Sequence, residues 1–460
     1  MAHIIDHEFY RDSWGTPEMR AVFAERKRFQ RWMDIWAALA AVQAEMGVVP
    51  QDAADAIVAA ADKGELDEDF IREDLGRAGH TLVPVLRAFE KACGPDAGEW
   101  IHYGATTQDI QDTALSLEMR DAWRILMRNM IALESACLDQ AKRWRDTVMV
   151  GRTHNQHGLP MTLGMKIASW AAEIRRDIER MKALPARCFP LMMHGGVGTM
   201  SALGPRAGEI VDRLGARLDL KVPPISWASA RDGVAEFAAT LGIAAGTCGR
   251  IANEVYQLSR TEIGELHEPM PDSVVGSTTM PHKRNAVRSE FSGTMVKIVM
   301  SNVGLALQSM EVTHERDASV WRLDWHTIPE SCVLMDRVIG HMTIVVGGLM
   351  VNEARIAANL SMTDGAIMSE AVMFRLSEKL GKQTAHHVLH EVLMRAAGTN
   401  TPFRKALREA PELEGRFTQA DFEAMLDYGS YVGTAGAQVD AVVAEAEARA
   451  KDDPDLEEAT

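Results

Sequence analysis

Three short polar segments, each punctuated by glycine, carry the residue types that could do chemistry. They are 102–109 (HYGATTQD), 151–158 (GRTHNQHG) and 276–285 (GSTTMPHKRN). Each segment adjoins the end of a stretch with a long helical pattern, where backbone N–H groups are free to hold an anion. Hydroxyl, amide, imidazole and ammonium groups are therefore gathered where an anionic substrate could bind.

The segment 276–285 is the most informative of the three. Within ten residues it holds glycine, several hydroxyls, proline, histidine, lysine, arginine and asparagine, immediately before a helical stretch that contains Glu290. Such a composition has little use in a packed core. It suits a mobile, basic loop that clamps an anion, and we expect the loop to close over its substrate.

The same three segments resemble conserved motifs of the fumarase/aspartase superfamily. GSTTMPHKRN resembles the family's GSSxMPxKxN signature, residues 151–164 (GRTHNQHGLPMTLG) are similar to its second conserved segment, and HYGATTQD is similar to its first. The motifs occur in the family's order, and the resemblance covers nearly the whole chain. It implies an all-α, three-domain protein whose central helices assemble into a homotetramer, with each active site built from segments of three subunits.

The chemistry of this family explains the residue types. A hydrogen on the carbon next to a carboxylate is a very weak acid, because its removal adds negative charge to a group that is already anionic. Fixed donors and cations must therefore hold that carboxylate. The resemblance implies that the substrate is bound by Thr106, Thr107, Gln108, Thr153, Lys283, Asn285 and His80.

The resemblance also implies a base and an acid. Ser277 matches the general base, and a serine can act as a base only where a cation and backbone donors favour its alkoxide. Lys283 and the loop amides are the candidates for that task. A departing amine or similar group needs a proton, and His154, held by Glu290, matches the family's acid-side pair.

Each of these residues also has a structural interpretation. Ser277 could be a turn residue of a glycine-rich loop, and His154 could be a hydrogen-bonded core histidine. Lys283 and Arg284 could belong to a solvated face, an interpretation that fits Arg284 better. Glu290 could simply complement the dipole at a helix N-terminus.

Two other groups of residues have a composition that could bind a metal ion or a phosphate, but neither is predicted to do so. Residues 386–391 (HHVLHE) place imidazoles at i and i+4 on a helix, but HExxH is absent and no further ligand is evident. The glycine-rich run 194–199 lacks the GK[ST] ending of a phosphate loop and resembles a structural turn of the superfamily. We expect neither a metal ion nor a cofactor.

The residues that flank the three motifs are similar to those of adenylosuccinate lyases and 3-carboxymuconate cycloisomerases. PHKRN at 281–285 is one pointer, and residues 314–325 begin like the HERD of adenylosuccinate lyases before turning into a cycloisomerase-like W-x-x-x-W. PISW at 224–227 with the following Arg-Asp also looks cycloisomerase-like, although Ala228 stands where those enzymes tend to have histidine.

Departures from the adenylosuccinate lyases bear on the leaving group. Those enzymes begin with an RYSxPEM-like segment that helps to hold the nucleotide, whereas this chain has SWGTPEM at 13–19. Their phosphate-binding serine and arginine after HERD are replaced here by Val320, Trp321 and Trp325. Burying a phosphate dianion without partners is costly, so we expect a leaving group without a nucleotide.

These observations predict a lyase that acts by β-elimination on a substituted succinate and releases fumarate. Cleavage of a C–N bond is favoured over cleavage of another C–heteroatom bond, and the substrate is a small dicarboxylate. The alternatives are a 3-carboxy-cis,cis-muconate cycloisomerase, which forms a lactone, an adenylosuccinate lyase, and a non-catalytic structural homologue of the crystallin kind. The sequence does not identify the leaving group.

Long helices are the elements that must position these residues. Apolar residues over 115–137 recur in steps of three and four for about six turns. Similar stretches run over 160–184, 233–263, 288–308 and 327–351, and no alternating β-branched run suggests a central sheet. Such helices predict an elongated bundle that buries its remaining apolar flank against copies of itself.

The chain is predicted to have three parts. Residues 1–105 form an N-terminal helical domain, 106–355 the central long-helix bundle and oligomer core, and 356–460 a C-terminal helical domain. Shorter helix signals, such as Thr16-Pro17-Glu18 and the stretch 377–392, lie in the two flanking parts.

Composition and charge limit the classes of partner that the protein can be expected to bind. The net charge of -16 over 460 residues opposes nucleic-acid binding, which needs a concentrated basic surface. No apolar run approaches the roughly 20 residues that span a bilayer, so we expect no membrane partner. Five scattered cysteines without a CxxC pair predict reduced thiols, and the N-terminus resembles neither a signal nor a transit peptide. We expect a cytoplasmic protein.

Overall fold

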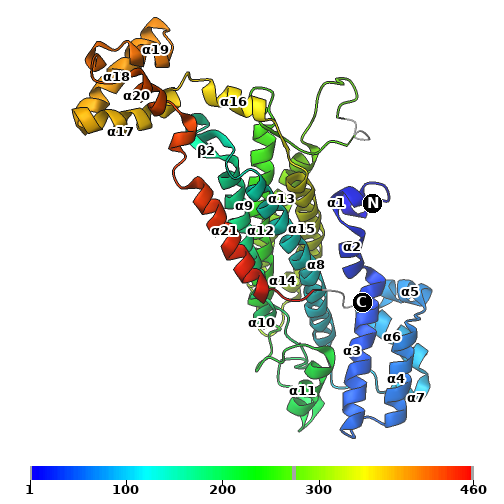
Figure 1. Ribbon diagram of the computed structural model, residues 1–460. Coiled ribbons are helices and arrows are strands. Elements are labelled where there is room, and N and C mark those ends of the chain that lie inside the picture. The colour runs from blue at the N-terminus through cyan, green and yellow to red at the C-terminus, as the bar shows by residue number, and fades with distance from the viewer. Residues whose placement is uncertain (1–2, 272–275, 457–460) are drawn as a thin grey trace.

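A computed structural model describes residues 3–271 and 276–456 as an elongated, largely helical molecule (Figure 1). A bundle of long helices runs through its centre, and groups of shorter helices lie at the upper left and lower right of the view. The predicted all-α fold with a central bundle is confirmed. Each predicted long stretch is a helix: α8 (Thr107–Arg143), α9 (Leu163–Lys182), α12 (Asp232–Leu258), α13 (Val287–Gln308) and α15 (Asp324–Gly347).

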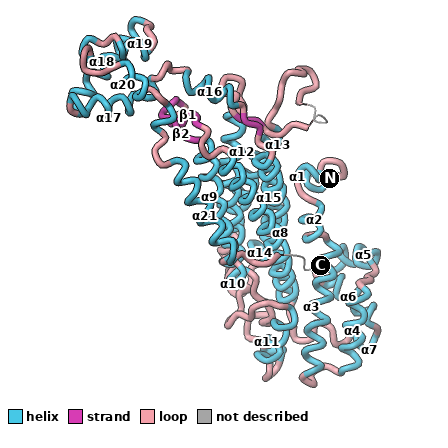
Figure 2. Tube along the Cα trace, in the orientation of Figure 1, coloured by secondary structure: helices cyan, strands magenta, loops and turns pink. Residues whose placement is uncertain are grey.

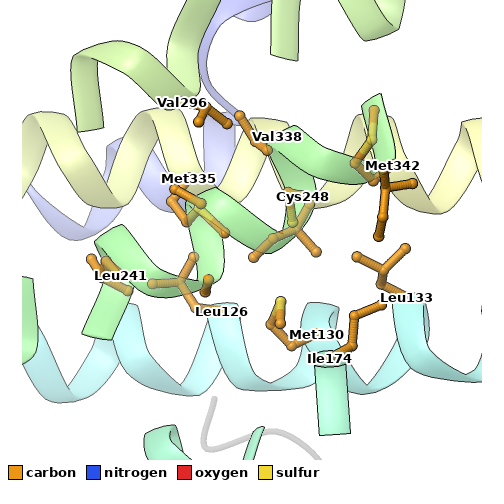
Figure 3. Packing of buried hydrophobic residues seen from close by; sticks show 14 of the residues in the cluster. Leu126, Met130, Leu133, Ile174, Leu241, Cys248, Val296, Met335, Val338 and Met342 are labelled. Carbon is orange, nitrogen blue, oxygen red and sulfur yellow. The ribbon is translucent and has the colours of Figure 1, made fainter. Parts of the chain in front are cut away.

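The apolar stripe of α8 lies at the centre of the main core. Its members recur in steps of three and four and so share one face of the helix. All of them are inaccessible to solvent: Met119, Ala122, Leu126, Met130, Leu133 and Cys137. Figure 3 shows the middle of the stripe packed among Leu241 and Cys248 of α12 and Met335 and Val338 of α15. Truncating one of these leucines to alanine would cost about 2 to 5 kcal/mol.

The bundle has two ends, which hydrogen bonds between helices define. At one end the buried Arg231 bridges Asp112 of α8 (Nη1 to Oδ2, 2.7 Å) and Asp324 at the start of α15 (Nη2 to Oδ2, 2.5 Å). At the other end Gln140 Nε2 donates to the carbonyl oxygen of Gly347 over 3.0 Å. Helices α8, α12 and α15 therefore all begin at the first end, called here the Arg231 end. Because α8 has 37 residues, the two ends are about 55 Å apart.

Strands occur only in two small antiparallel pairs within the described ranges (Figure 2). The hairpin of β1 (Val148–Thr153) and β2 (Gln156–Thr162) connects α8 to α9. The second pair joins β3 (Leu266–His267), after α12, to β4 (Met350–Val351), after α15. Both pairs lie opposite the Arg231 end, at what is called here the hairpin end.

The N-terminal helices have an apolar cluster of their own, which includes Trp36, Ile57 and Phe89. Helix α3 (Glu25–Glu45) packs against α4 and against the start of α8, and so joins this cluster to the Arg231 end. The other elements are η1 (Ile4–Asp6), α1 (Arg11–Trp14), α2 (Pro17–Val22), α4 (Gln51–Lys63), α5 (Glu68–Ala78), α6 (Val83–Cys93) and α7 (Pro95–Gly98).

The C-terminal helices form a third cluster around Leu376 and Val392, which also takes in Val150 of β1. They are α16 (Glu353–Ser361), α17 (Ser369–Leu380), α18 (Lys382–Thr399), α19 (Phe403–Arg408) and α20 (Gln419–Met425). The chain then returns as α21 (Ala435–Arg449), which packs along α9 and places Val439 in the main core. The domain boundaries at 105/106 and 355/356 stay predictions.

The remaining α-helices of the described residues are α10 (Pro185–Cys188), α11 (Ala207–Leu218) and α14 (Ala318–Trp321). Short 3-10 helices are η2 (Ser201–Leu203), η3 (Ala366–Met368), η4 (Pro411–Leu413), η5 (Tyr428–Tyr431) and η6 (Ala450–Asp452). All five cysteines are free thiols, and four of them are buried. Among the helices that the structure describes, none has the length and apolarity required to cross a membrane.

Candidate active site

The first predicted segment forms the N-terminus of α8, at the Arg231 end. Thr106 precedes the helix, and Thr107 and Gln108 open its first turn. The backbone N–H of Thr106 donates to Oδ2 of Asp109 over 2.9 Å, which closes the helix start. Gln108 is buried, and its Nε2 donates to Oδ2 of Asp112 (2.9 Å). Three of the predicted carboxylate-binding residues are thus neighbours in one turn.

Arg316 joins this turn from a distant part of the chain, the loop that precedes α14. Its Nε donates to Oε1 of Gln108 over 2.9 Å, and its Nη2 donates to Oγ1 of Thr106 and to the carbonyl oxygen of Gly196, both over 3.2 Å. All three acceptors are neutral. The guanidinium therefore places a cation beside the predicted carboxylate-binding residues.

Asp109 fastens the glycine-rich run 194–199 to the same helix end. Its carboxylate accepts hydrogen bonds from the backbone N–H groups of His194 (2.8 Å) and Gly195 (3.0 Å). Burial raises the pKa of Asp109, and these hydrogen bonds with the nearby charge of Arg316 offset only part of that shift. The run is a turn that holds the Gly196 carbonyl where Arg316 can reach it.

A buried ionic network lies behind Gln108. Asp112 accepts hydrogen bonds from Gln108, from Arg231 and from Nε1 of Trp321 (2.9 Å). Burial alone would lower the pKa of Arg231, but Asp112 and Asp324 outweigh that effect and raise it, so the guanidinium stays charged. Removing one partner would leave a buried charge uncompensated, at a cost of about 3 to 5 kcal/mol. The network thereby fixes the side-chain amide of Gln108.

His80 approaches this end from the N-terminal helices, between α5 and α6. Its Nδ1 accepts hydrogen bonds from the backbone N–H groups of Leu82 (3.2 Å) and Val83 (3.3 Å), so the neutral ring carries its proton on Nε2. The next residue, Thr81, accepts a hydrogen bond at Oγ1 from Nε2 of Gln111 in α8 (3.1 Å). His80 therefore lies against the helix that carries the first segment, with a donor on Nε2.

The second predicted segment is the turn of the β1–β2 hairpin, at the opposite end of the bundle. Thr153 pairs with Gln156, so the turn consists of His154 and Asn155 alone. Their φ angles are 51° and 60°, and two successive positive φ angles are typical of the type I′ turn that suits the twist of a hairpin. The turn exposes the side chains of Thr153 and His154.

Glu265 ties this hairpin to the start of the connection from β3 to α13, which contains the third segment. It is fully buried just before β3, and it accepts hydrogen bonds from both terminal nitrogens of Arg152 (2.9 and 2.6 Å). Asn359 Nδ2 adds a third, over 2.8 Å. The hairpin and the long connection from β3 to α13 therefore lie at the same end of the molecule.

Ser277 stands in that connection, in an environment that suits a base. Its Oγ accepts hydrogen bonds from the backbone N–H groups of Met280 (3.1 Å) and Thr279 (3.4 Å). Two fixed donors on one oxygen stabilise a negative charge there, so they favour the alkoxide form of the side chain. Lys283 is exposed six residues further on, and no carboxylate pairs with it among residues 3–271 and 276–456.

The base of the Ser277 loop is closed by its own residues. Asn285 Nδ2 donates to the carbonyl oxygen of Gly276 over 2.8 Å. A Cβ at position 276 would collide with the carbonyl oxygen of Lys283, so only glycine fits where the two ends of the loop meet. The amide of Asn285 is thereby engaged in loop structure in the free chain.

Glu290 is exposed in the first turn of α13. The free N–H groups of that turn are taken by Glu268, which accepts from Arg288 (3.1 Å) and Ser289 (2.8 Å). Within one chain, no hydrogen bond or ion pair joins Glu290 to His154 in the described structure. Their pairing stays a prediction for the assembled protein.

The predicted site residues thus fall into two groups at opposite ends of the bundle. Thr106, Thr107, Gln108 and His80 belong to the Arg231 end, whereas Thr153, His154, Ser277, Lys283, Asn285 and Glu290 belong to the hairpin end. The length of α8, about 55 Å, lies between the groups. One chain cannot bring both groups to one small molecule.

Sequence reasoning did not place Arg316 and Asp109 in the site. Arg316 belongs to the HERD motif at 314–317, which indicated only the branch of the family and not a role in the site. Asp109 is the last letter of HYGATTQD, but nothing in the sequence showed that its partners are backbone amides 85 residues away.

The comparisons with known proteins agree with this architecture. Residues 11–301 match the family model described as Lyase, and residues 365–442 match the one described as Adenylosuccinate lyase C-terminus. The chain belongs to the fumarase/aspartase superfamily and is one of its lyases.

Individual relatives are similar over almost their full length. The N-acetyl-S-(2-succino)cysteine lyase of Dickeya dadantii (strain 3937) is 40% identical over 444 residues, which cover 96% of this chain and 97% of that protein. The enzyme of the same name from Enterococcus italicus is 38% identical and covers 96% and 97%. The crystal structure of the 3-carboxy-cis,cis-muconate lactonizing enzyme from Pseudomonas putida superposes with a TM-score of 0.91, at 32% identity, over 96% of this chain and 99% of that one.

Proposed function

We propose that the protein eliminates a thiol from a succinate that carries sulfur on carbon 2, and so releases fumarate. The sequence favoured cleavage of a C–N bond; two relatives named for a C–S substrate move the proposal to sulfur. The observation that carries the proposal is the pair of backbone donors on Ser277 Oγ, because an alkoxide held in this way can remove a proton next to a carboxylate.

The two groups of residues divide the work of binding. In the proposed complex one carboxylate of the substrate lies at the start of α8, where Arg316 supplies the charge and Thr106 and Thr107 supply hydroxyls. Thr153, Lys283 and Asn285, from the hairpin ends of other copies, hold the remaining oxygen atoms. The carboxylate next to the reacting carbon then has cations and donors fixed around it before charge develops.

The proposed elimination balances without a cofactor. Ser277 Oγ takes a proton from carbon 3 of the succinyl group, and the electron pair left behind delocalises into the neighbouring carboxylate. This pair then forms the double bond between carbons 2 and 3 while the bond from carbon 2 to sulfur breaks. His154 delivers a proton to the departing sulfur, and Glu290 stabilises the charged imidazole. The products are fumarate and a free thiol.

We also propose the homotetramer, since each site needs both ends of the bundle from different copies. Two inactive variants provide the test: Arg316→Met, damaged at the Arg231 end, and Ser277→Ala, damaged at the hairpin end. If their subunits are dissociated, mixed equally and reassembled, about a quarter of the sites will have both ends intact and regain activity. Mixtures that stay inactive, although mass analysis shows mixed oligomers, would place each site within one chain.

Cycloisomerisation of 3-carboxymuconate is the second candidate, favoured by the close superposition on the lactonizing enzyme. Adenylosuccinate is disfavoured as a substrate by the surroundings of α14. There Trp321 and Trp325 pack edge to face with centroids 5.7 Å apart, and the Trp321 N–H is used by Asp112, so neither position offers a cation to a phosphate.

A substrate panel tests the proposal. Purified protein is incubated with N-acetyl-S-(2-succino)cysteine, aspartate, an N-substituted succinate, adenylosuccinate and 3-carboxymuconate. Fumarate is followed by its absorbance and thiol by a colorimetric reagent. We expect fumarate and thiol in equal amounts from the sulfur compound. Fumarate from adenylosuccinate, or loss of absorbance from 3-carboxymuconate, at a higher kcat/KM would overturn the proposal in favour of that activity.

A further inference from the structure

A cavity of about 400 Å³ lies between the N-terminal helices and α8, and the mechanism proposed above makes no use of it. Its walls come from α3, α5, α6, the first third of α8 and the first turn of α15. The volume falls within the range of small-molecule pockets, about 300 to 1,000 Å³. The cavity is therefore large enough for a substituent that extends beyond the succinyl group.

The cavity continues the face of α8 that carries Thr107, a residue of the proposed carboxylate site. Gln111, Leu115 and Glu118 follow Thr107 in steps of four, four and three residues, so all four lie on one face of the helix. The last three of them line the cavity. Because four residues span about 6 Å of a helix, the cavity begins about one turn beyond the carboxylate site.

Two further contacts connect the cavity wall with the surroundings of that site. Thr81 follows His80 in the chain, lines the cavity, and accepts a hydrogen bond at Oγ1 from Nε2 of Gln111 (3.1 Å). Trp325 lines the cavity from α15 and packs edge to face on Trp321 of the buried ionic network. A substituent that extends from a bound succinate along α8 therefore enters this cavity.

Apolar side chains that line the cavity keep surface that a ligand can cover. Phe23, Phe29 and Trp325 are partly exposed, and Leu75 of α5 is 49% exposed, although all four line the cavity. Covering such surface removes it from water, which is favourable in proportion to the apolar area buried. The accessible part of the wall therefore suits an apolar group.

The charged residues of the lining balance one another. There are three arginines and three glutamates, namely Arg26, Arg28, Arg72, Glu25, Glu68 and Glu118. Arg28 donates through Nε and Nη2 to the two oxygens of Glu118 (2.8 and 2.9 Å), and Arg26 pairs with Glu68 (2.8 Å). A charged ligand would find the partners in these two pairs already engaged, so the cavity disfavours a charge.

We propose that this cavity binds the substituent on the sulfur of the substrate, and that the preferred substituent is an apolar, uncharged group. The proposal rests on the function proposed above and names the class of thiol that is released. While Thr107 and Arg316 hold a carboxylate of the succinyl group, the substituent lies along α8 and covers Phe23, Phe29 and Leu75. The elimination itself is unchanged, and its products are fumarate and an apolar thiol.

The test uses succinates that carry an ethylsulfanyl, butylsulfanyl or hexylsulfanyl group on carbon 2. A fourth substrate carries a 3-carboxypropylsulfanyl group, which is similar in length to the butyl chain but ends in a charge. Three proteins are assayed by fumarate absorbance: the wild type, Leu75→Trp, which fills the cavity from its rim, and Met394→Trp as the matched control. Met394 is 61% exposed on α18, among the C-terminal helices.

We expect kcat/KM of the wild type to rise by about fourfold for each added methylene group, or by about 100-fold or more from ethyl to hexyl. The carboxypropyl substrate should react no faster than the ethyl one. Leu75→Trp should lower the ratio of hexyl to ethyl at least about tenfold, whereas Met394→Trp should keep it. A wild-type ratio near one, or a ratio that Leu75→Trp leaves unchanged, overturns the cavity assignment.

A second measurement requires no turnover. Succinates with an ethyl or hexyl group directly on carbon 2 have no leaving group, so calorimetric titration of the wild type reports binding alone. The hexyl compound should bind at least about tenfold more tightly, and equal affinities overturn the assignment. If no sulfanyl succinate of the series gives fumarate, the proposed function itself fails. Fumarate release that ignores chain length would instead overturn the cavity assignment alone, so the two failures are distinguishable.

Discussion

Arg316 Nε donates a hydrogen bond to Oε1 of Gln108 over 2.9 Å, although 208 positions separate the two residues in the chain. The first turn of α8 carries hydroxyl and amide groups but no cation of its own. Arg316 brings the cation, and the Asp112–Arg231 pair holds Gln108 in the orientation that receives it. The proposed carboxylate site therefore depends on a loop that follows α13 as much as on the helix itself.

Replacing Arg316 by methionine tests this dependence. Loss of the guanidinium removes a charge that holds the substrate carboxylate, so we expect kcat/KM to fall by about 100-fold or more. Arg322→Met is the matched control, because Arg322 is exposed just after α14 and should leave kinetics unchanged. Equal kinetics for both variants would remove Arg316 from the site.

Ser277→Ala should abolish turnover, because it removes the atom on which two backbone donors converge. Circular dichroism and the oligomer mass should stay those of the wild type, since the loop makes no part of the helical core. The neighbouring exposed Thr278 provides the control, Thr278→Ala, for which we expect activity close to that of the wild type. Substantial turnover by Ser277→Ala would show that another group is the base.

The proposed role of His154 as an acid predicts a dependence on the leaving group. His154→Asn preserves a residue that tolerates the positive φ of this turn but removes the proton donor. For an alkyl thiol we expect a loss of about 100-fold or more in kcat, and a much smaller loss for an aryl thiol, which departs readily as the thiolate. Equal losses for both thiols, measured by fumarate release, would contradict the role.

His102 should make the protein sensitive to acid. Its Nδ1 accepts a hydrogen bond from Nε1 of Trp36 (3.0 Å), and burial lowers the pKa of His102 to about 4. In the unfolded chain the imidazole has a pKa of about 6.5, so the unfolded state takes up a proton at a higher pH than the folded state does. The contribution of His102 to the free energy of unfolding is therefore fully present above about pH 6.5 and is lost as the pH falls from about 6.5 towards 4.

At pH 5 the loss from His102 is on the order of 2 kcal/mol relative to pH 7.5. His102→Gln cannot titrate, so its urea midpoint should change less between these two pH values than that of the wild type at the same protein concentration. Parallel pH profiles for the two proteins would show that His102 does not cause the sensitivity.

The sequence was sufficient to predict the bundle because its core follows a repeat that can be read locally. The residues from Met119 to Cys137 define one face of α8 without reference to any other helix, and the structure buries all of them. The candidate site residues could also be named locally, since Ser277 and Lys283 stand inside a continuous motif, and their roles stay predictions.

The sequence could not show which residues meet across long separations. Arg316 reaches Thr106 through a loop whose path depends on the packing of α13 and α15, and Asp109 binds amides of a turn that has no helical or strand pattern. Non-local contacts of this kind are set by tertiary packing and leave no periodic trace in the chain.

The return of α21 to the bundle has a mechanical consequence. The outlying C-terminal helices are joined to the bundle both where the chain departs through α16 and where it comes back along α9, so a displacement of these helices is restrained at both places. Their apolar cluster also grips Val150 of β1, the strand that leads into the turn with His154. A displacement of these helices would therefore be transmitted through β1 to the turn that carries the proposed proton donor.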